Sequence, residues 1–215
     1  MLVLTRMGFF SRFKETGGPG CTERLIRTTD LFFIASAQEV DDRVKGRVLN
    51  LEYYISSRRD TSGCKPFFAL IEYAAKIDLP DEVMSHPVIM AMEEATNDYI
   101  SWVNDILSYN VEQSSHSPHN MVAVLMCEQR MNLQDAVDYS YQLCKGTIQR
   151  FEDNRVILPS WGEEVDRQVA IYVQGLEDWM IGSLHWSFNS TRYLGKDGHT
   201  VKRYRIISLL PKMPL

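Results

Sequence analysis

Apolar positions along the chain recur at helical spacing, and no segment alternates apolar and β-branched residues between hairpin signals. The first clear stripe has spacings of four, three, four, four and three residues, which fits one face of an α-helix. It consists of Phe33, Ala37, Val40, Val44, Val48 and Leu51. Asp30 is placed to cap this helix, which is predicted to run from 31 to 57 and to end at the turn-forming residues 58–63.

Proline and loop signals divide the following segments. Pro66 suits the first turn of a helix that carries residues 67–77 and stops before Pro80. The residues Ser-His-Pro at 85–87 open a long helix that reaches about residue 113, and residues 114–119 have the composition of a surface loop. Further helices are predicted over about 120–130, 133–152 and 161–188. The pattern therefore predicts an all-α fold.

Composition and charge narrow the class of protein. The 215 residues are 45% hydrophobic and 24% charged, which excludes intrinsic disorder and fits one domain, 1–215, with a poorly defined start at 1–20 and a C-terminal tail at 196–215. The net charge of −5 is a poor electrostatic footprint for nucleic acid, and the longest apolar run is too short to span a membrane. No signal peptide is recognisable, and four cysteines without zinc-like spacing indicate reduced thiols in a cytoplasmic protein.

A polar stripe lies in the helix predicted to end near residue 113. Asn104, Ser108 and Glu112 are one helical turn apart, so their side chains share one helix face. The residues around them are apolar, which indicates that the stripe faces the interior. An amide, a hydroxyl and a carboxylate oxygen suit Mg²⁺ better than zinc or copper. The spacing alone also arises by chance on solvated helices, so both interpretations stay open at this point.

The segment 104–112 reads N-D-x-x-S-x-x-x-E, which resembles the second metal motif of class I terpene synthases, and its wording NDILSYNVEQ is similar to fungal, basidiomycete-type sesquiterpene synthases. The segment 54–66 resembles that family's diphosphate sensor. Arg58 lies 46 positions before Asn104 and Arg59 lies 45, so either is a candidate.

The end of the chain resembles the same family. Arg192-Tyr193 matches its terminal Arg-Tyr pair, with Trp186 six residues earlier, and 206–212 is similar to its C-terminal strip. The resemblance implies an antiparallel helical bundle around an apolar cavity, closed by a diphosphate and Mg²⁺ ions. The implied activity is that of a carbon–oxygen lyase that ionises a prenyl diphosphate, with farnesyl diphosphate preferred, to a cyclic hydrocarbon or alcohol and diphosphate.

The resemblance also assigns roles to single residues. It implies metal binding by Asn104, Ser108 and Glu112, diphosphate contacts from Arg58 or Arg59 with Arg192 and Tyr193, and cavity lining by Phe67, Phe68, Trp102 and Trp186. Plainer interpretations stand beside these. The two phenylalanines suit an ordinary core, and arginines at the end of a helix favour its negative dipole end. His116 and His119, in a Ser/Pro loop, are expected to be solvated.

One family feature has no counterpart in the sequence. Asp41-Asp42-Arg43-Val44-Lys45 ends in lysine and lies too near Arg58 to be the aspartate-rich motif that binds the other metal ions. The opening residues, with 9–13, resemble a segment well inside such enzymes. We therefore expect the chain to lack the family's N-terminal part and to be impaired as a cyclase. The alternative is a non-catalytic helical remnant that acts as a binding or interaction module.

Overall fold

The computed structural model describes residues 2–45 and 50–214, and side chains from Gly8 onward. All regular structure in this part of the chain is helical, as the sequence predicts. The helices are α1 (Leu2–Thr16), α2 (Pro19–Val44), α3 (Leu51–Thr61), α4 (Cys64–Ala75), α5 (Asp81–Met84), α6 (Pro87–Ser114), α7 (Met121–Glu128), α8 (Leu133–Val156), α9 (Glu163–Asn189), α10 (Thr191–Leu194) and α11 (Gly198–Tyr204), with a 3₁₀ turn at Gly195–Asp197.

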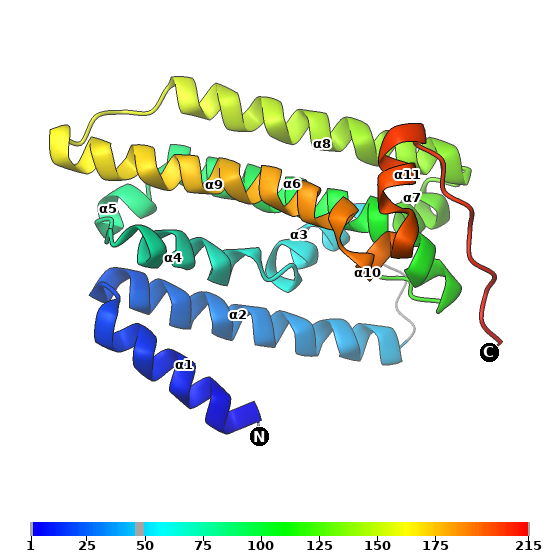
Figure 1. Ribbon diagram of the computed structural model, residues 1–215, viewed down its shortest axis with the longest axis horizontal. Coiled ribbons are helices and arrows are strands. Elements are labelled where there is room, and N and C mark those ends of the chain that lie inside the picture. The colour runs from blue at the N-terminus through cyan, green and yellow to red at the C-terminus, as the bar shows by residue number, and fades with distance from the viewer. Residues whose placement is uncertain (1, 46–49, 215) are drawn as a thin grey trace.

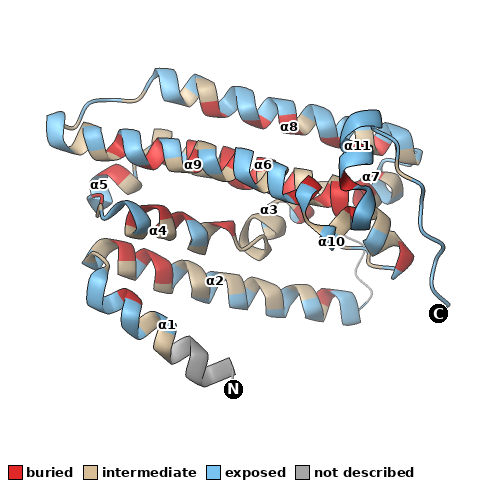
Figure 2. Cartoon of the chain, viewed as in Figure 1, coloured by how far each residue is buried: buried red, intermediate tan, exposed pale blue. Residues whose placement is uncertain are grey.

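The long helices form an antiparallel bundle with α6 at its centre. Helices α2, α4, α6, α8 and α9 lie along one axis, and consecutive long helices run in opposite directions (Figure 1). Helix α6 packs against α8, α9, α7, α3 and α4. Buried residues line the faces that these helices turn toward one another, while the outer faces are exposed (Figure 2). The polar stripe on α6 therefore belongs to the most enclosed helix of the fold.

The single helix predicted over 31–57 is wrong, because two helices occupy this region. Helix α2 already begins at Pro19, which suits a first helical turn, and Asp30 lies inside it. Helix α3 starts after Asn50, whose side-chain oxygen accepts a hydrogen bond from the Tyr53 backbone N–H at 2.8 Å. The apolar spacing runs on across this boundary, and one member of the stripe, Val48, lies outside the described residues. The cap at Asn50 therefore starts a new helix at a point where the apolar spacing alone predicts one continuous helix.

The later helices agree more closely with the pattern. Helices α6, α7, α8 and α9 lie within a few residues of the predicted ranges, and a loop separates α6 from α7. In the predicted tail, α11 adds Val201 to a small core with Leu107, Phe188 and Leu194. The segment after α11 lies along the end of α6, where the Asn110 side chain exchanges two hydrogen bonds with it.

A buried ion pair joins α2 to α4. Arg24 donates to Glu72 Oε1 at 2.7 Å and Oε2 at 2.9 Å, and Glu72 is fully buried. A Cβ at Gly175 on α9 would lie 2.3 Å from Ile71 on α4, so these two helices approach closely at that point. No helix in the described part of the chain is long and apolar enough to cross a membrane.

Candidate functional site

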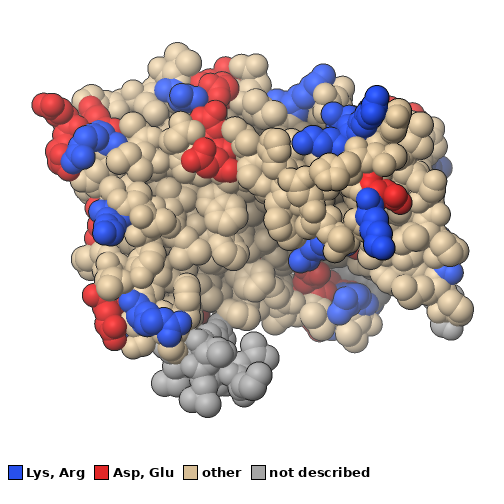
Figure 3. Space-filling model, viewed as in Figure 1, with Lys and Arg blue, Asp and Glu red and all other residues tan. Residues whose placement is uncertain are grey.

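A cavity of about 1710 Å³ opens among α3, α4, α6 and α9, and α2, α10 and the loop before α7 contribute to its polar end. The face between α4 and α9 is largely uncharged, and charged side chains lie around its edges (Figure 3). The cavity thus has an apolar body and one end that gathers polar side chains.

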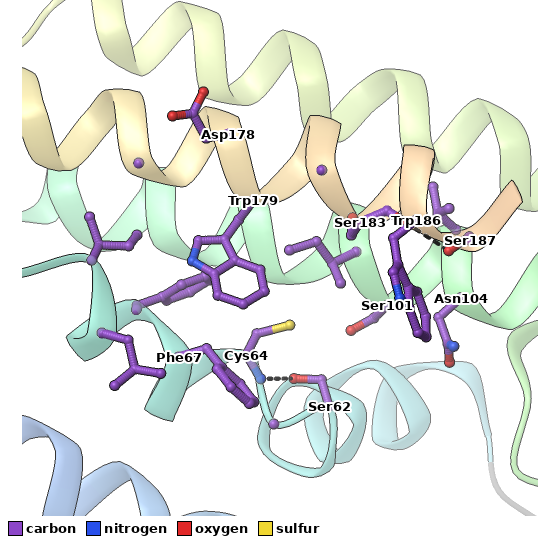
Figure 4. A pocket seen from close by; sticks show the side chains of 18 of the residues that line it. Ser62, Cys64, Phe67, Ser101, Asn104, Asp178, Trp179, Ser183, Trp186 and Ser187 are labelled. Atoms are coloured by element: carbon purple, nitrogen blue, oxygen red, sulfur yellow. Dashed lines mark hydrogen bonds between the residues drawn. The ribbon is translucent and has the colours of Figure 1, made fainter. Parts of the chain in front are cut away.

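Aromatic side chains form the apolar body. Trp179 and Trp186 descend from α9 toward α4 and α6 (Figure 4). The rings of Phe67 and Trp179 are 5.3 Å apart, and Phe68 also borders the cavity. Trp179 is a wall residue that the sequence reasoning missed, although its position seven residues before Trp186 places both on one helix face.

Trp102 lies elsewhere. It is 3% exposed and sits in the core of the bundle, with its ring 6.5 Å from that of Tyr54. It is not among the described residues that line the cavity, so this structure gives no support to the expected lining role of Trp102. Two residues along a helix turn a side chain by about 200°, which points Trp102 away from the face that carries Asn104.

The polar stripe of α6 lies at the polar end. Asn104 and Glu112 line the cavity, and Ser108, 3% exposed, lies between them on the helix. The Ser108 hydroxyl is buried without a hydrogen-bond partner within normal distance and angle limits. Buried hydroxyls are normally satisfied, so one that lies beside an amide and a carboxylate without a hydrogen bond of normal geometry fits a bound cation. Among the described residues, no group of three or more His, Cys, Asp or Glu side chains is arranged to hold a metal ion.

Asn120 orients Glu112. Its side-chain nitrogen donates to Glu112 Oε2 at 2.9 Å and to the Asp105 carbonyl at 2.7 Å, while its oxygen caps α7 at Val122. Burial raises the pKa of Glu112, and the Asn120 hydrogen bond and the nearby Ser108 hydroxyl oppose that rise. Sequence reasoning did not single out Asn120, although its place immediately before α7 is a cap signal.

Arg58 lies between α3 and α6. Its guanidinium donates to Asn104 Oδ1 at 2.7 Å and makes two 3.1 Å bonds to Asp105 Oδ1. Asp105, 1% exposed, also accepts from the Tyr54 hydroxyl and from the Met121 backbone N–H. Burial and the Asp105 charge raise the pKa of Tyr54, which keeps its hydroxyl protonated as a donor. Asp105 therefore holds the arginine and the tyrosine and does not face the cavity.

Arg59 turns the other way. It forms a two-bond pair with Asp98 at 2.7 and 2.8 Å and also contacts Glu94. Arg150 of α8 joins the same carboxylate at 2.6 Å. Of the two sensor candidates, Arg58 is among the described residues that border the cavity and Arg59 is not. Arg59 instead links α3 to α6 and, through the shared Asp98, to α8.

The corner between α3 and α4 is fixed by α6. The Ser62 hydroxyl bonds Asn97 Oδ1 at 2.7 Å and accepts from the Cys64 backbone N–H, and Asn97 Nδ2 donates to the Arg59 carbonyl at 2.7 Å. Gly63 has φ +77°, a left-handed conformation that a residue with a side chain rarely adopts. These contacts set the end of α3 that carries Arg58.

The Arg-Tyr pair closes the same end. Tyr193 accepts a hydrogen bond on its hydroxyl from Asn104 Nδ2 at 2.7 Å, and its ring meets Trp186 edge-on at 5.9 Å. Arg192 is exposed, lies 5.4 Å from the Tyr193 ring centroid, and borders the cavity. Residues separated by almost ninety positions are thus brought together around Asn104.

His119 and Glu39 border the polar end as well. The expectation that His119 is solvated is wrong, because its side chain is 14% exposed and its Nε2 lies 3.4 Å from Glu39 Oε2. Burial, with the nearby charge of Arg58, lowers the pKa of His119 to about 4. This environment depends on packing from α2, which the loop composition around His119 does not reveal.

This helical bundle is the fold of class I terpene synthases of known structure. A crystal structure of a-eudesmol synthase matches with a TM-score of 0.74 and 25% identity over 81% of this chain and 57% of that one. Linalool/nerolidol synthase from Streptomyces clavuligerus matches in fold, with a TM-score of 0.75 and 22% identity over 82% of this chain and 62% of that one.

The chain belongs to the terpene synthase family, since the model described as "Terpene synthase family 2, C-terminal metal binding" matches residues 2–150. Sesquiterpene synthase Agr1 of Cyclocybe aegerita is 52% identical over 96% of this chain and 60% of its own length. Alpha-muurolene synthase of Coprinopsis cinerea is 52% identical over 96% of this chain and 48% of its own length. The chain thus spans about half to three fifths of these relatives.

Proposed function

We propose that the protein is a Mg²⁺-dependent sesquiterpene cyclase that ionises farnesyl diphosphate. The observation that carries this proposal is the buried Ser108 hydroxyl, which has no hydrogen bond of normal geometry and shares one α6 face with Asn104 and Glu112, at the end of the cavity where Arg58 and Tyr193 both contact Asn104. Several relatives are named sesquiterpene synthases, which supports a fifteen-carbon substrate.

Two sets of residues would bind the diphosphate end of the substrate. Asn104, Ser108 and Glu112 supply oxygen donors that fit Mg²⁺, and the bound ion would neutralise charge that builds up on the leaving diphosphate. Arg58 and Arg192 offer guanidinium donors suited to phosphate oxygens. These groups would stabilise the charge of the leaving diphosphate in place of water.

The apolar body would receive the isoprenoid chain. Phe67, Trp179 and Trp186 present ring faces and edges to the cavity. An aromatic face stabilises a carbocation through its quadrupole, and an apolar wall excludes the water that would quench it. The same walls would hold the chain in a folded shape that brings its double bonds toward the cation.

As a cyclase this chain is proposed to turn over farnesyl diphosphate slowly but measurably, because its sequence has no recognisable aspartate-rich metal motif. The second candidate, a non-catalytic remnant that keeps the binding site, rests on the same observation. Both functions require the site on α6, and turnover separates them.

The test is a Mg²⁺-dependent assay of diphosphate release from farnesyl diphosphate, run beside calorimetry of pyrophosphate binding with Mg²⁺. Glu112→Ala removes a cavity carboxylate, and Glu163→Ala, an exposed position on α9, is the matched control. Turnover lost only in Glu112→Ala supports the cyclase. Binding without turnover, lost in the same variant, supports the remnant. Absence of both turnover and pyrophosphate binding contradicts both proposed functions.

A further inference from the structure

The side chain of Asn104 is bracketed on both sides by groups that belong to the diphosphate end of the site. Its oxygen accepts from Arg58 Nη2 at 2.7 Å, and its nitrogen donates to the Tyr193 hydroxyl at 2.7 Å. An asparagine side chain offers a metal only its oxygen, since the amide nitrogen is a donor. The one atom of Asn104 that suits a cation therefore already receives one, the guanidinium of Arg58.

Two cations that share one amide oxygen repel each other. The Arg58 side chain is 13% exposed and Asp105 beneath it is 2% exposed, so water screens this repulsion poorly. Asp105 balances the charge of Arg58 through two hydrogen bonds, and it remains a partner for the arginine when the contact with Asn104 is lost. Arg58 can thus leave Asn104 while its Nε and charge stay anchored.

We propose that Arg58 gates the metal site: a divalent cation and the Arg58 guanidinium compete for Asn104 Oδ1, so that metal binding turns Arg58 toward the diphosphate. This inference rests on the proposed function and adds a sequence of binding events to it. Arg58 weakens the binding of metal alone, because the metal must displace its guanidinium. It strengthens the joint binding of metal and diphosphate, because the displaced guanidinium gains phosphate oxygens as partners.

The gate predicts opposite effects from one substitution. Arg58→Gln removes the competing cation and should tighten binding of a divalent ion alone by at least about fivefold. The same variant loses a phosphate contact and should weaken binding of pyrophosphate in excess Mg²⁺ by at least about tenfold. A residue with a purely structural role does not move these two affinities in opposite directions.

The chain offers a matched control and a second variant. Arg59→Gln removes the same charge one residue away, but Arg59 is held by Asp98 outside the cavity. The double variant Arg58→Gln/Asp105→Asn replaces the buried ion pair by a neutral pair, which guards against misfolding. It also separates the gate from simple attraction of metal to an unpaired Asp105.

The probe for the metal is Mn²⁺, whose free form is counted by its paramagnetic resonance signal, and calorimetry with Mg²⁺ gives pyrophosphate affinity. The gate predicts tighter Mn²⁺ binding in Arg58→Gln and in the double variant, no change in Arg59→Gln, and weaker pyrophosphate binding in both Arg58 variants. Unchanged Mn²⁺ affinity in Arg58→Gln, an equal gain in Arg59→Gln, or a gain absent from the double variant overturns the gate alone. Failure of wild type to bind pyrophosphate with Mg²⁺ overturns the proposed function itself.

Discussion

Asp105 is the buried anchor of the polar end of the cavity, and the substitution Asp105→Asn tests this directly. The Asp105 side chain is 2% exposed, and its carboxylate accepts hydrogen bonds from the Arg58 guanidinium, the Tyr54 hydroxyl and the Met121 backbone N–H. Asparagine has nearly the same shape but carries no charge and offers one acceptor atom in place of two. The variant therefore leaves the Arg58 cation without its counter-ion.

The expected cost follows from these contacts. Breaking a buried ion pair by removing one partner costs about 3–5 kcal/mol, because the remaining charge stays out of water. A chain of this size has a total stability of about 5–15 kcal/mol. At about 2–4 °C per kcal/mol, Tm should fall by roughly 6–20 °C. Asp153→Asn, exposed on α8, should change stability by no more than about 0.5 kcal/mol.

Urea unfolding followed by circular dichroism measures this cost, and a double-mutant cycle with Arg58→Gln identifies its source. If the unpaired cation is the cause, adding Arg58→Gln to Asp105→Asn should recover much of the loss, since both charges are then gone. A loss below about 1 kcal/mol in Asp105→Asn, or losses that add in the double variant, would refute the reasoning.

Three further predictions concern neighbouring residues. The pKa of His119 is lowered to about 4, against about 6.5 in unfolded chains, so the stability that neutral His119 contributes is present above pH 6.5 and is lost as the pH falls toward 4. In urea unfolding, His119→Gln should therefore lose less stability than wild type between pH 7 and 4.5, and equal losses contradict this. Asn120→Ser keeps a cap for α7 but removes the hydrogen bond to Glu112, so pyrophosphate binding with Mg²⁺ should weaken several-fold in calorimetry while the circular dichroism spectrum stays unchanged. Undiminished pyrophosphate affinity counts against an orienting role for Asn120. Trp179→Leu should weaken binding of a non-hydrolysable farnesyl diphosphate analogue about tenfold, because it removes aromatic area that the ligand would bury, and pyrophosphate affinity should not change. A loss of affinity for both ligands contradicts a role of Trp179 confined to the apolar body.

Much of the fold could be predicted from local signals. Pro87 and Asn132 mark the starts of α6 and α8, and the helical spacing after them carries each helix to its end. The boundary between α2 and α3 could not be predicted from spacing, because Val44 and Leu51 keep the same helical phase on both sides of it. The cap at Asn50 was the local signal against a continuous helix.

The candidate site shows where rotation about a helix axis suffices and where it does not. Rotation alone separates Trp102 from Asn104 and joins Trp179 to Trp186, so both assignments were within reach of the sequence. Arg58 and Arg59 are adjacent, and only their partners on α6, Asp105 and Asp98, distinguish them. Contacts between distant segments of the chain decide such cases.

The central claim is that the oxygens of Asn104, Ser108 and Glu112 bind one divalent ion. Crystals of the chain grown with Mn²⁺ and pyrophosphate, measured for anomalous scattering, test it most directly. We expect a single strong manganese peak within coordination distance, about 2.0–2.6 Å, of all three side-chain oxygens and in contact with pyrophosphate. A peak elsewhere, or ordered pyrophosphate on the arginines with no metal beside Ser108, would contradict it.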